Sequence, residues 1–394
     1  MRTNTFFLFG LFAIVSLCAG CGGGGSTVGP AGNGPVSTGT TISGVASKGI
    51  IKGGRVDIYA PPASGDLGSK ILLKSTSTDQ SGGYSANLGS YTGVVLVEVS
   101  GSYTDEATGA STTIAADAPL RAAQVIGSAG GTVTASVTPL TELATRKALL
   151  GTVLTASAVQ TANTLVSNLF QFDVVGTRPV EPGVTAMNAA SQVQRDYTLA
   201  LAGISKQAAT AGSVGAVLST WSQELAATNR LSSTSVTNLQ NSVTSFLADS
   251  THNLTGVSTL PSGVADIGKY TGTLYLATQG SATAPVKSIQ VTLALPTGVT
   301  VKQDSGGNAL VSLTGVALQA AAPAVNNNSP GTLILGIIST PGFGLGQFAA
   351  ITYVAQPGTI PVAGDFHVTS QQITGFDGTQ DFDISTATVV PVLP

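Results

Sequence analysis

Alternating apolar and polar residues run through the stretch from residue 41 to residue 137. Segments 41–45 and 54–59 alternate with the two-residue period of a half-buried strand, and 94–99 is rich in β-branched residues. Clusters of Gly and Pro, such as Pro61-Pro62, separate these runs. Several short strands at this spacing predict a β-sandwich over 41–137.

The pattern changes to a helical period at Thr138-Pro139. Thr138 can cap a helix whose first position is Pro139, and further helices are predicted from about Ser157 and over 185–209. Two later stripes carry apolar residues every three or four positions: Val217, Leu218, Trp221 and Leu225, then Val236, Leu239, Val243, Phe246 and Leu247. We therefore predict a small helical bundle over 138–255.

Strand patterns return over 256–394. The clearest runs are 271–276, 288–295, 309–313, 332–338, 348–354 and 366–369. No Asp, Glu, Lys or Arg occurs between Asp304 and Asp365. This apolar stretch does not read as a membrane span, because 326–330 and Pro341-Gly342 interrupt the ~20 continuous residues that a span needs. A second sandwich with two buried inner faces is predicted instead.

The first forty residues read as a leader and a tether. Arg2 precedes an apolar run over 6–17, which has the length of a secretory signal and not of a membrane span. The sequence Leu17-Cys18-Ala19-Gly20-Cys21 resembles the lipobox of bacterial lipoproteins, although Cys18 stands where that family usually has Leu. The resemblance implies a signal peptide over 1–20 and an acylated Cys21; the alternative is an ordinary secretory signal that leaves Cys21 a free thiol.

Residues 21–40 are rich in Gly, Ser and Pro without apolar periodicity, which predicts a flexible tether. Gly22 follows Cys21, which resembles the outer-membrane sorting pattern of lipoproteins. The expected location is therefore the outer membrane or cell surface, with a lipid anchor in the membrane.

Only 9% of the 394 residues are charged, against ~25% in typical soluble domains. The net charge of −3 excludes a nucleic-acid partner, which requires clustered Lys and Arg. Both cysteines, Cys18 and Cys21, lie at the proposed signal, so the folded segments are expected to have no internal disulfide.

Two of the predicted segments each resemble a known protein family. Residues 42–45, 53–59, 78–84 and 94–101 resemble a carboxypeptidase-regulatory-like or transthyretin-like module, which implies a structural spacer. Tyr84, after the Gly82-Gly83 turn, is expected to close one end of that sandwich.

In the last segment, 288–293 with 296–299 and then 344–353 resemble a cohesin-type domain. That resemblance implies a jelly-roll β-sandwich that serves protein docking and is related to carbohydrate-binding modules. The expected fold class is a multidomain, mainly β chain with a helical middle.

Candidate chemistry is sparse. The two histidines, His252 and His367, lack metal-ligand spacing, and no Gly-x-Ser-x-Gly elbow is present. Asp377, Asp381 and Asp383 can supply oxygen ligands to a structural Ca²⁺, the alternative being a polar hairpin turn. No other cofactor is predicted.

We therefore predict a non-enzymatic, lipid-anchored surface protein that acts in binding, adhesion or assembly through its C-terminal sandwich. The expected partner is a surface protein or a polysaccharide. The alternative function is a polysaccharide-binding or polysaccharide-processing accessory. Sugar stacking requires exposed aromatic rings, and Trp221 is expected in the core because it lies on an apolar helix stripe.

Overall fold

The structure, a computed structural model, describes residues 39–62, 67–151, 153–304 and 306–394. The described residues begin with the strands β1 (Thr41–Val45), β2 (Arg55–Ala60), β3 (Ile71–Ser77), β4 (Gly83–Asn87), β5 (Gly93–Thr104), β6 (Ser111–Ile114), β7 (Leu120–Ile126) and β8 (Thr132–Thr134). They form a three-stranded sheet in the order β4-β1-β8 and a five-stranded sheet in the order β3-β2-β5-β6, in which β7 also pairs with β5.

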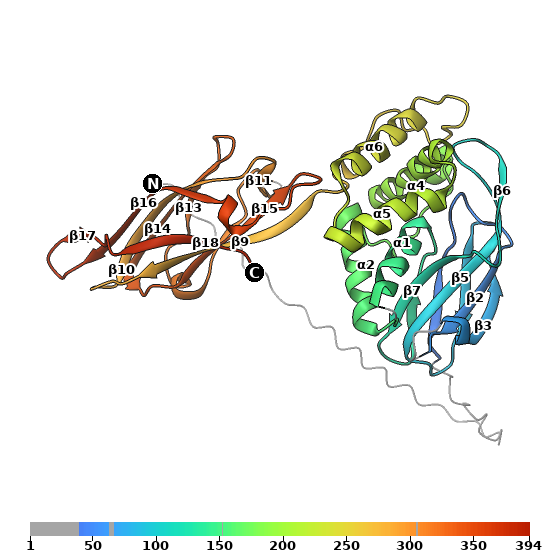
Figure 1. Cartoon of the computed structure of the whole chain (residues 1–394), viewed down its shortest axis with the longest axis horizontal. Helices are drawn as coiled ribbons and strands as arrows, with labels where there is room; N and C mark the ends of the chain where they lie inside the picture. Colours follow the sequence, from blue (N-terminus) through green and yellow to red (C-terminus); the bar gives the residue numbers. More distant parts are fainter. Residues whose placement is uncertain (1–38, 63–66, 152, 305) are drawn as a thin grey trace, which may run out of the picture. The chain divides into compact units, whose positions relative to one another are not determined.

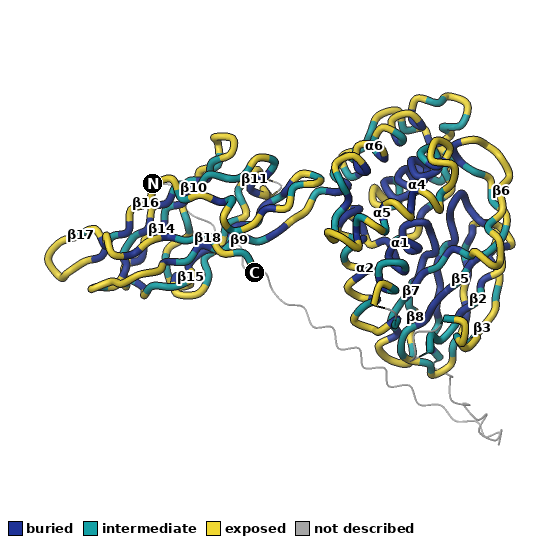
Figure 2. The backbone as a smooth tube through the Cα atoms, viewed as in Figure 1, coloured by how far each residue is buried: buried dark blue, intermediate teal, exposed yellow. Residues whose placement is uncertain are grey.

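The central strand β5 is buried on both sides over residues 95–97, which belong to the dark part of its tube in Figure 2, whereas residues 100–104 are half-buried or exposed. Val95, Val97 and Val99 belong to the main apolar core, together with Ile42 of β1. Leu96 points the other way, into a small cluster with apolar residues of the first two helices. The run of β-branched residues that predicts this strand therefore places apolar side chains on both of its faces.

The helices that follow in the described residues are α1 (Pro139–Ala148), α2 (Ala156–Phe170), α3 (Val184–Ala189), α4 (Gln192–Ala211), α5 (Val214–Thr228), α6 (Ser233–Leu247) and α7 (Ser262–Ala265). The predicted start of α1 is confirmed, because the Thr138 side chain caps the helix and Pro139 occupies its first turn. α1 and α2 lie against β7 (Figure 1).

One helix prediction is wrong. The segment 185–209 is divided between α3 and α4, because Ala190 adopts an extended backbone with ψ of 153°. Ser191 then caps α4 by accepting a hydrogen bond from the Gln194 amide, and the Gln194 side chain accepts one from the Ser191 amide in return.

The strand region and the helical region share one apolar core. Buried residues of β1, β2 and β5 belong to the same cluster as those of α1, α4, α5 and α6. Both predicted apolar stripes, around Trp221 and Leu239, are confirmed as buried. The junction at residues 137 and 138 therefore separates two types of secondary structure within a continuous core.

The last segment contains β9 (Tyr270–Gly280), β10 (Val286–Ala294), β11 (Val299–Val301), β12 (Val311–Leu313), β13 (Ala324–Asn326), β14 (Thr332–Phe343), β15 (Gln347–Ala355), β16 (His367–Phe376), β17 (Asp381–Asp383) and β18 (Ala387–Val392). One sheet has the order β13-β14-β10-β16-β17, and the other β11-β15-β9-β18, with β12 also on β15. Their inner faces form a separate apolar core that includes Ile289, Leu335 and Ile351. The predicted class, mainly β with a helical middle, is confirmed.

Candidate functional site

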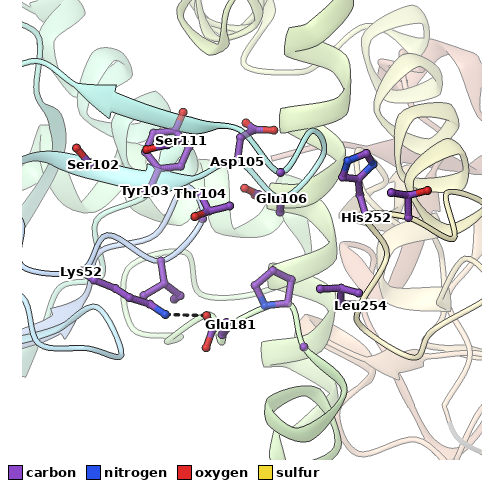
Figure 3. A pocket seen from close by; sticks show the side chains of 16 residues that line it. Lys52, Ser102, Tyr103, Thr104, Asp105, Glu106, Ser111, Glu181, His252 and Leu254 are labelled. Carbon is purple, nitrogen blue, oxygen red and sulfur yellow. Dashed lines mark hydrogen bonds and ion pairs between the residues drawn. The ribbon is translucent and has the colours of Figure 1, made fainter.

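A pocket with a volume of about 490 Å³ lies at the end of β5. β5 contributes Tyr103, the following loop contributes Asp105, and a separate loop contributes His252 (Figure 3). At one side the Lys52 ammonium pairs with the Glu181 carboxylate at 2.9 Å. The lining is therefore a mixture of charged, aromatic and backbone groups from four segments of the chain.

Behind this pocket lies a buried cluster formed by Lys48, Asp105, Glu106 and Ser205, which we call the Lys48 cluster. The Lys48 Nζ lies 2.9 Å from Asp105 Oδ2 and 3.9 Å from Glu106 Oε2, and it donates to the Ser205 hydroxyl of α4. The side chains of Lys48, Asp105 and Glu106 are 2%, 14% and 3% exposed. One cation therefore faces two carboxyl groups in a largely dry site.

The two acids of the Lys48 cluster differ in acidity. Burial raises the pKa of Glu106 above its ordinary value, against the opposing effect of the Lys48 charge. Burial acts on Asp105 in the same direction, but the Lys48 charge and hydrogen bonds from Lys48 and Thr108 lower its pKa overall. For Lys48 itself, burial favours a lower pKa, but Glu106, Tyr103 and Asp105 together raise it.

His252 lies at the pocket beside a second charged group. Its Nδ1 and the Lys206 Nζ each lie 3.0 Å from Asp249 Oδ2. Hydrogen bonds from His252 and Lys206 hold the pKa of Asp249 well below its ordinary value. The hydrogen-bond partner of the His252 ring is the Asp249 carboxylate, and no hydroxyl or thiol of the described residues hydrogen-bonds to that ring.

The second candidate is the outward side of three neighbouring strands in the C-terminal sandwich, β14, β10 and β16 (Figure 1). Cross-strand register places Gln290 between Gly336 and Gln372, and Ser288 between Ile338 and Thr374. We call this surface the β10 face; its residues are Ser288, Gln290, Thr292, Ile334, Gly336, Ile338, Ser370, Gln372 and Thr374.

None of these nine residues carries a charge. The nearest charged groups along the strands lie at the margins: Lys287 before Ser288, and Asp383 on β17, which accepts a hydrogen bond from Gln372 at 3.1 Å. The β10 face is therefore an uncharged surface of hydroxyl, amide and aliphatic groups.

The edges of the two C-terminal sheets are short or blocked. β11, β12, β13 and β17 are each three residues long. On the longer edge strand β18, the Val389 amide donates to Gln371 Oε1 at 2.8 Å, and Pro391, on the same side of the strand, has no N–H. These features protect sheet edges against pairing with another chain.

The residues predicted for metal binding lie in and after a hairpin turn. Asp377 Oδ1 accepts hydrogen bonds from the amides of Thr379 and Gln380, and Asp381 and Asp383 lie on β17. Within the described ranges, no group of three or more His, Cys, Asp or Glu side chains is arranged to hold a metal ion.

The calcium site therefore stays a prediction, with a simple measurement. If these carboxylates bind Ca²⁺, excess Ca²⁺ raises the melting temperature and EDTA lowers it, because a ligand that binds the folded state stabilises it. A melting temperature that responds to neither contradicts the prediction.

Other sequence predictions have clear outcomes. Trp221 is 1% exposed and is confirmed as a core residue. Tyr84 is buried and its hydroxyl donates to the Ala135 carbonyl, as expected for a residue that closes the sandwich. His367 is exposed at the start of β16. Cys21, the predicted acylation site, lies outside the described residues.

Sequence reasoning missed the Lys48 cluster. One signal was present: in a chain with only 9% charged residues, the adjacent pair Asp105-Glu106 follows directly on a strand.

The described residues contain no helix that is long and apolar enough to cross a membrane.

Comparisons with known proteins show no close relationship. No protein-family model matches the chain, and no curated protein matches it. A non-cellulosomal cohesin from the hyperthermophilic archaeon Archaeoglobus fulgidus is 16% identical, with a TM-score of 0.20 over 27% of this chain and 71% of that one. The full-length major pilin SpaD from Corynebacterium diphtheriae is 8% identical, with a TM-score of 0.16 over 89% of this chain and 79% of that one. Both TM-scores lie below 0.5, so neither likeness carries an argument, and the family resemblances in the sequence stay predictions.

Proposed function

We propose that this chain is a non-enzymatic, lipid-anchored surface protein that binds another protein through the β10 face. The observation that carries the proposal is the uncharged outer side of strands β14, β10 and β16. The cores of protein interfaces are depleted in charged residues, and none of the nine residues of the β10 face is charged.

The protected edges support a face rather than an edge as the binding surface. An added strand needs a free row of N–H and C=O groups. On β18 the Gln371 side chain already occupies the Val389 amide and, through its Nε2, the Ala387 carbonyl. The β10 face can bind a partner without free backbone groups, because its side chains lie on the outer side of the sheet.

A protein partner fits this face better than a polysaccharide. Sugar rings stack on exposed aromatic side chains. The nine residues of the β10 face include no aromatic ring, and Phe376 lies only beyond Thr374 at the end of β16. Polysaccharide binding is therefore the competing outcome of the experiment below.

Gln290→Arg is expected to weaken partner binding by about tenfold or more, since a buried unpaired charge costs more than ~1.4 kcal/mol. Gln290 lies at the centre of the face and is exposed, so the fold should tolerate the change. The matched control is Thr300→Arg, an exposed position on β11 of the opposite sheet. The measurement is capture of surface proteins by the full chain and its variants, followed by titration of the captured protein.

Equal binding by Gln290→Arg and the parent chain would contradict the proposed face. Saturable binding of the full chain to a glycan array, lost in Gln290→Arg and kept in Thr300→Arg, would replace the protein partner with a polysaccharide.

Cys21→Ser is expected to move the protein from the membrane fraction to the soluble fraction. The lipobox-like sequence at residues 17–21 supports acylation of the Cys21 thiol, which serine cannot replace. The measurement is fractionation of cells labelled with a radioactive fatty acid, with Cys18→Ser as control. Membrane association and label that persist in Cys21→Ser would exclude this anchor.

A further inference from the structure

The Lys48 cluster has a high free-energy cost if its side chains remain charged. Lys48, Asp105 and Glu106 bring three ionisable groups into a site where their side chains are at most 14% exposed. Removing charged groups from water costs several kcal/mol for each ion, and mutual attraction often fails to repay that cost. A reaction that removes two of the charges would abolish most of the penalty.

Geometry places the reacting groups for such a reaction. The Lys48 Nζ is held 2.9 Å from Asp105 Oδ2 by a direct hydrogen bond, so the carboxyl carbon lies one bond further on. On the opposite carboxyl side, Thr108 and two backbone amides donate to Asp105 Oδ1 and fix the orientation of the group. Groups held in contact in this way react with effective concentrations far above those in solution.

We propose that Lys48 and Asp105 join in an intramolecular amide bond between Nζ and the side-chain carboxyl carbon. The ammonium and the carboxylate lose one water molecule: Nζ forms the N–C bond and gives up two protons, and one Asp105 oxygen leaves with both of them. Charge and atoms balance without an oxidant, a reductant or a cofactor.

Glu106 serves as the proton carrier in this step. Its Oε2 lies 3.9 Å from the Lys48 Nζ, and among the described residues it has no hydrogen-bond partner. At 3.9 Å this oxygen lies beyond direct hydrogen-bond distance of Nζ, so the Glu106 carboxyl must first move toward Nζ. It then accepts a proton from Nζ and passes it to the leaving oxygen of Asp105, which returns Glu106 to its starting state. The pocket at the end of β5 borders Asp105 and Glu106 and gives the released water a way out.

The bond would link the segment after β1 to the end of β5, across 57 residues of sequence. The two cysteines of the chain are Cys18 and Cys21, so residues 39–394 cannot form a disulfide among themselves. An amide at this position would limit the unfolded chain as a disulfide does, and would not be broken by reducing agents. This inference does not depend on the β10 face.

The experiment is peptide mapping of the full chain, purified from cells, reduced and denatured before trypsin digestion. Trypsin releases 75–121 as one peptide, which contains Asp105 and Glu106. We expect this peptide in a branched product joined to Lys48, with a mass lower than the sum of its two parts by one water, and with fragment ions that place the link at Asp105. The exposed Lys52–Glu181 pair, also at 2.9 Å, is the internal control and should remain unlinked.

The proposal is contradicted if the unmutated chain yields a free 75–121 peptide at its unmodified mass and is cleaved after Lys48. This test needs no variant. A link at Glu106 overturns the assigned roles. Glu106→Gln, which keeps Lys48 and Asp105, should leave the two peptides separate; a branched product at the parental level in this variant removes Glu106 from the reaction. Lys52→Ala should keep the branched product.

Discussion

Replacing Glu142 with alanine is expected to lower the free energy of unfolding by about 3–5 kcal/mol. The Glu142 side chain is 4% exposed in α1 and accepts a two-pronged contact from Arg121 of β7, through Nε at 2.9 Å and Nη2 at 2.7 Å. It also accepts from Arg146 at 2.8 Å and from the Arg121 backbone amide at 3.1 Å. Without Glu142 the guanidinium of Arg121, largely shielded from water, keeps its charge and loses its partner.

Urea unfolding followed by circular dichroism measures this effect. The matched control is Glu181→Ala, since Glu181 pairs with Lys52 in an exposed ion pair, whose loss should cost about 0–1 kcal/mol. If both variants lose the same small amount of unfolding free energy, the ion pair between Glu142 of α1 and Arg121 of β7 does not stabilise the fold as the structure indicates.

The second large effect is expected for Trp221→Ala, with a loss of about 3–5 kcal/mol. Trp221 is 1% exposed, and its ring centroid lies 5.8 Å from that of Phe170 in the core shared by strands and helices. Alanine leaves a cavity that neighbouring helices can fill only in part. The loss should therefore affect the whole of this core and not α5 alone.

Trp221 is the chain's single tryptophan, so circular dichroism rather than fluorescence must follow unfolding in this variant. The control is Thr220→Ala, the exposed neighbour on α5, for which a change within about 0.5 kcal/mol is expected. A Trp221→Ala loss no larger than that of the control would mean that the indole is not a core side chain.

Elements with strong local signals could be predicted. Thr138-Pro139 begins α1 because a cap and a first-turn proline act within a few residues, and the alternation around Val291 fixes β10 because one side of that strand is buried. The break before Ser191 was missed although its capping box with Gln194 is local: the apolar period of 185–209 continues across it. Short strands such as β13 and β17 carry no period of their own and exist through pairing with β14 and β16.

The candidate sites depend on contacts that a sequence alone does not provide. Lys48 and Asp105 meet only because the segments that follow β1 and β5 come together in the fold, and Ser205 joins them from α4. For the β10 face, alternation tells which residues of one strand point outward. Only the register that sets Gln290 beside Gln372 shows that neutral residues of three strands form one surface.

Site-directed photo-crosslinking on intact cells tests directly whether the β10 face binds another protein. A photo-reactive phenylalanine analogue replaces Gln290 in the full chain, and in a second strain it replaces Thr300 on the opposite sheet. We expect one discrete protein adduct from position 290 and none from position 300. No adduct from position 290, or the same adduct from both positions, would contradict binding of a protein by the β10 face.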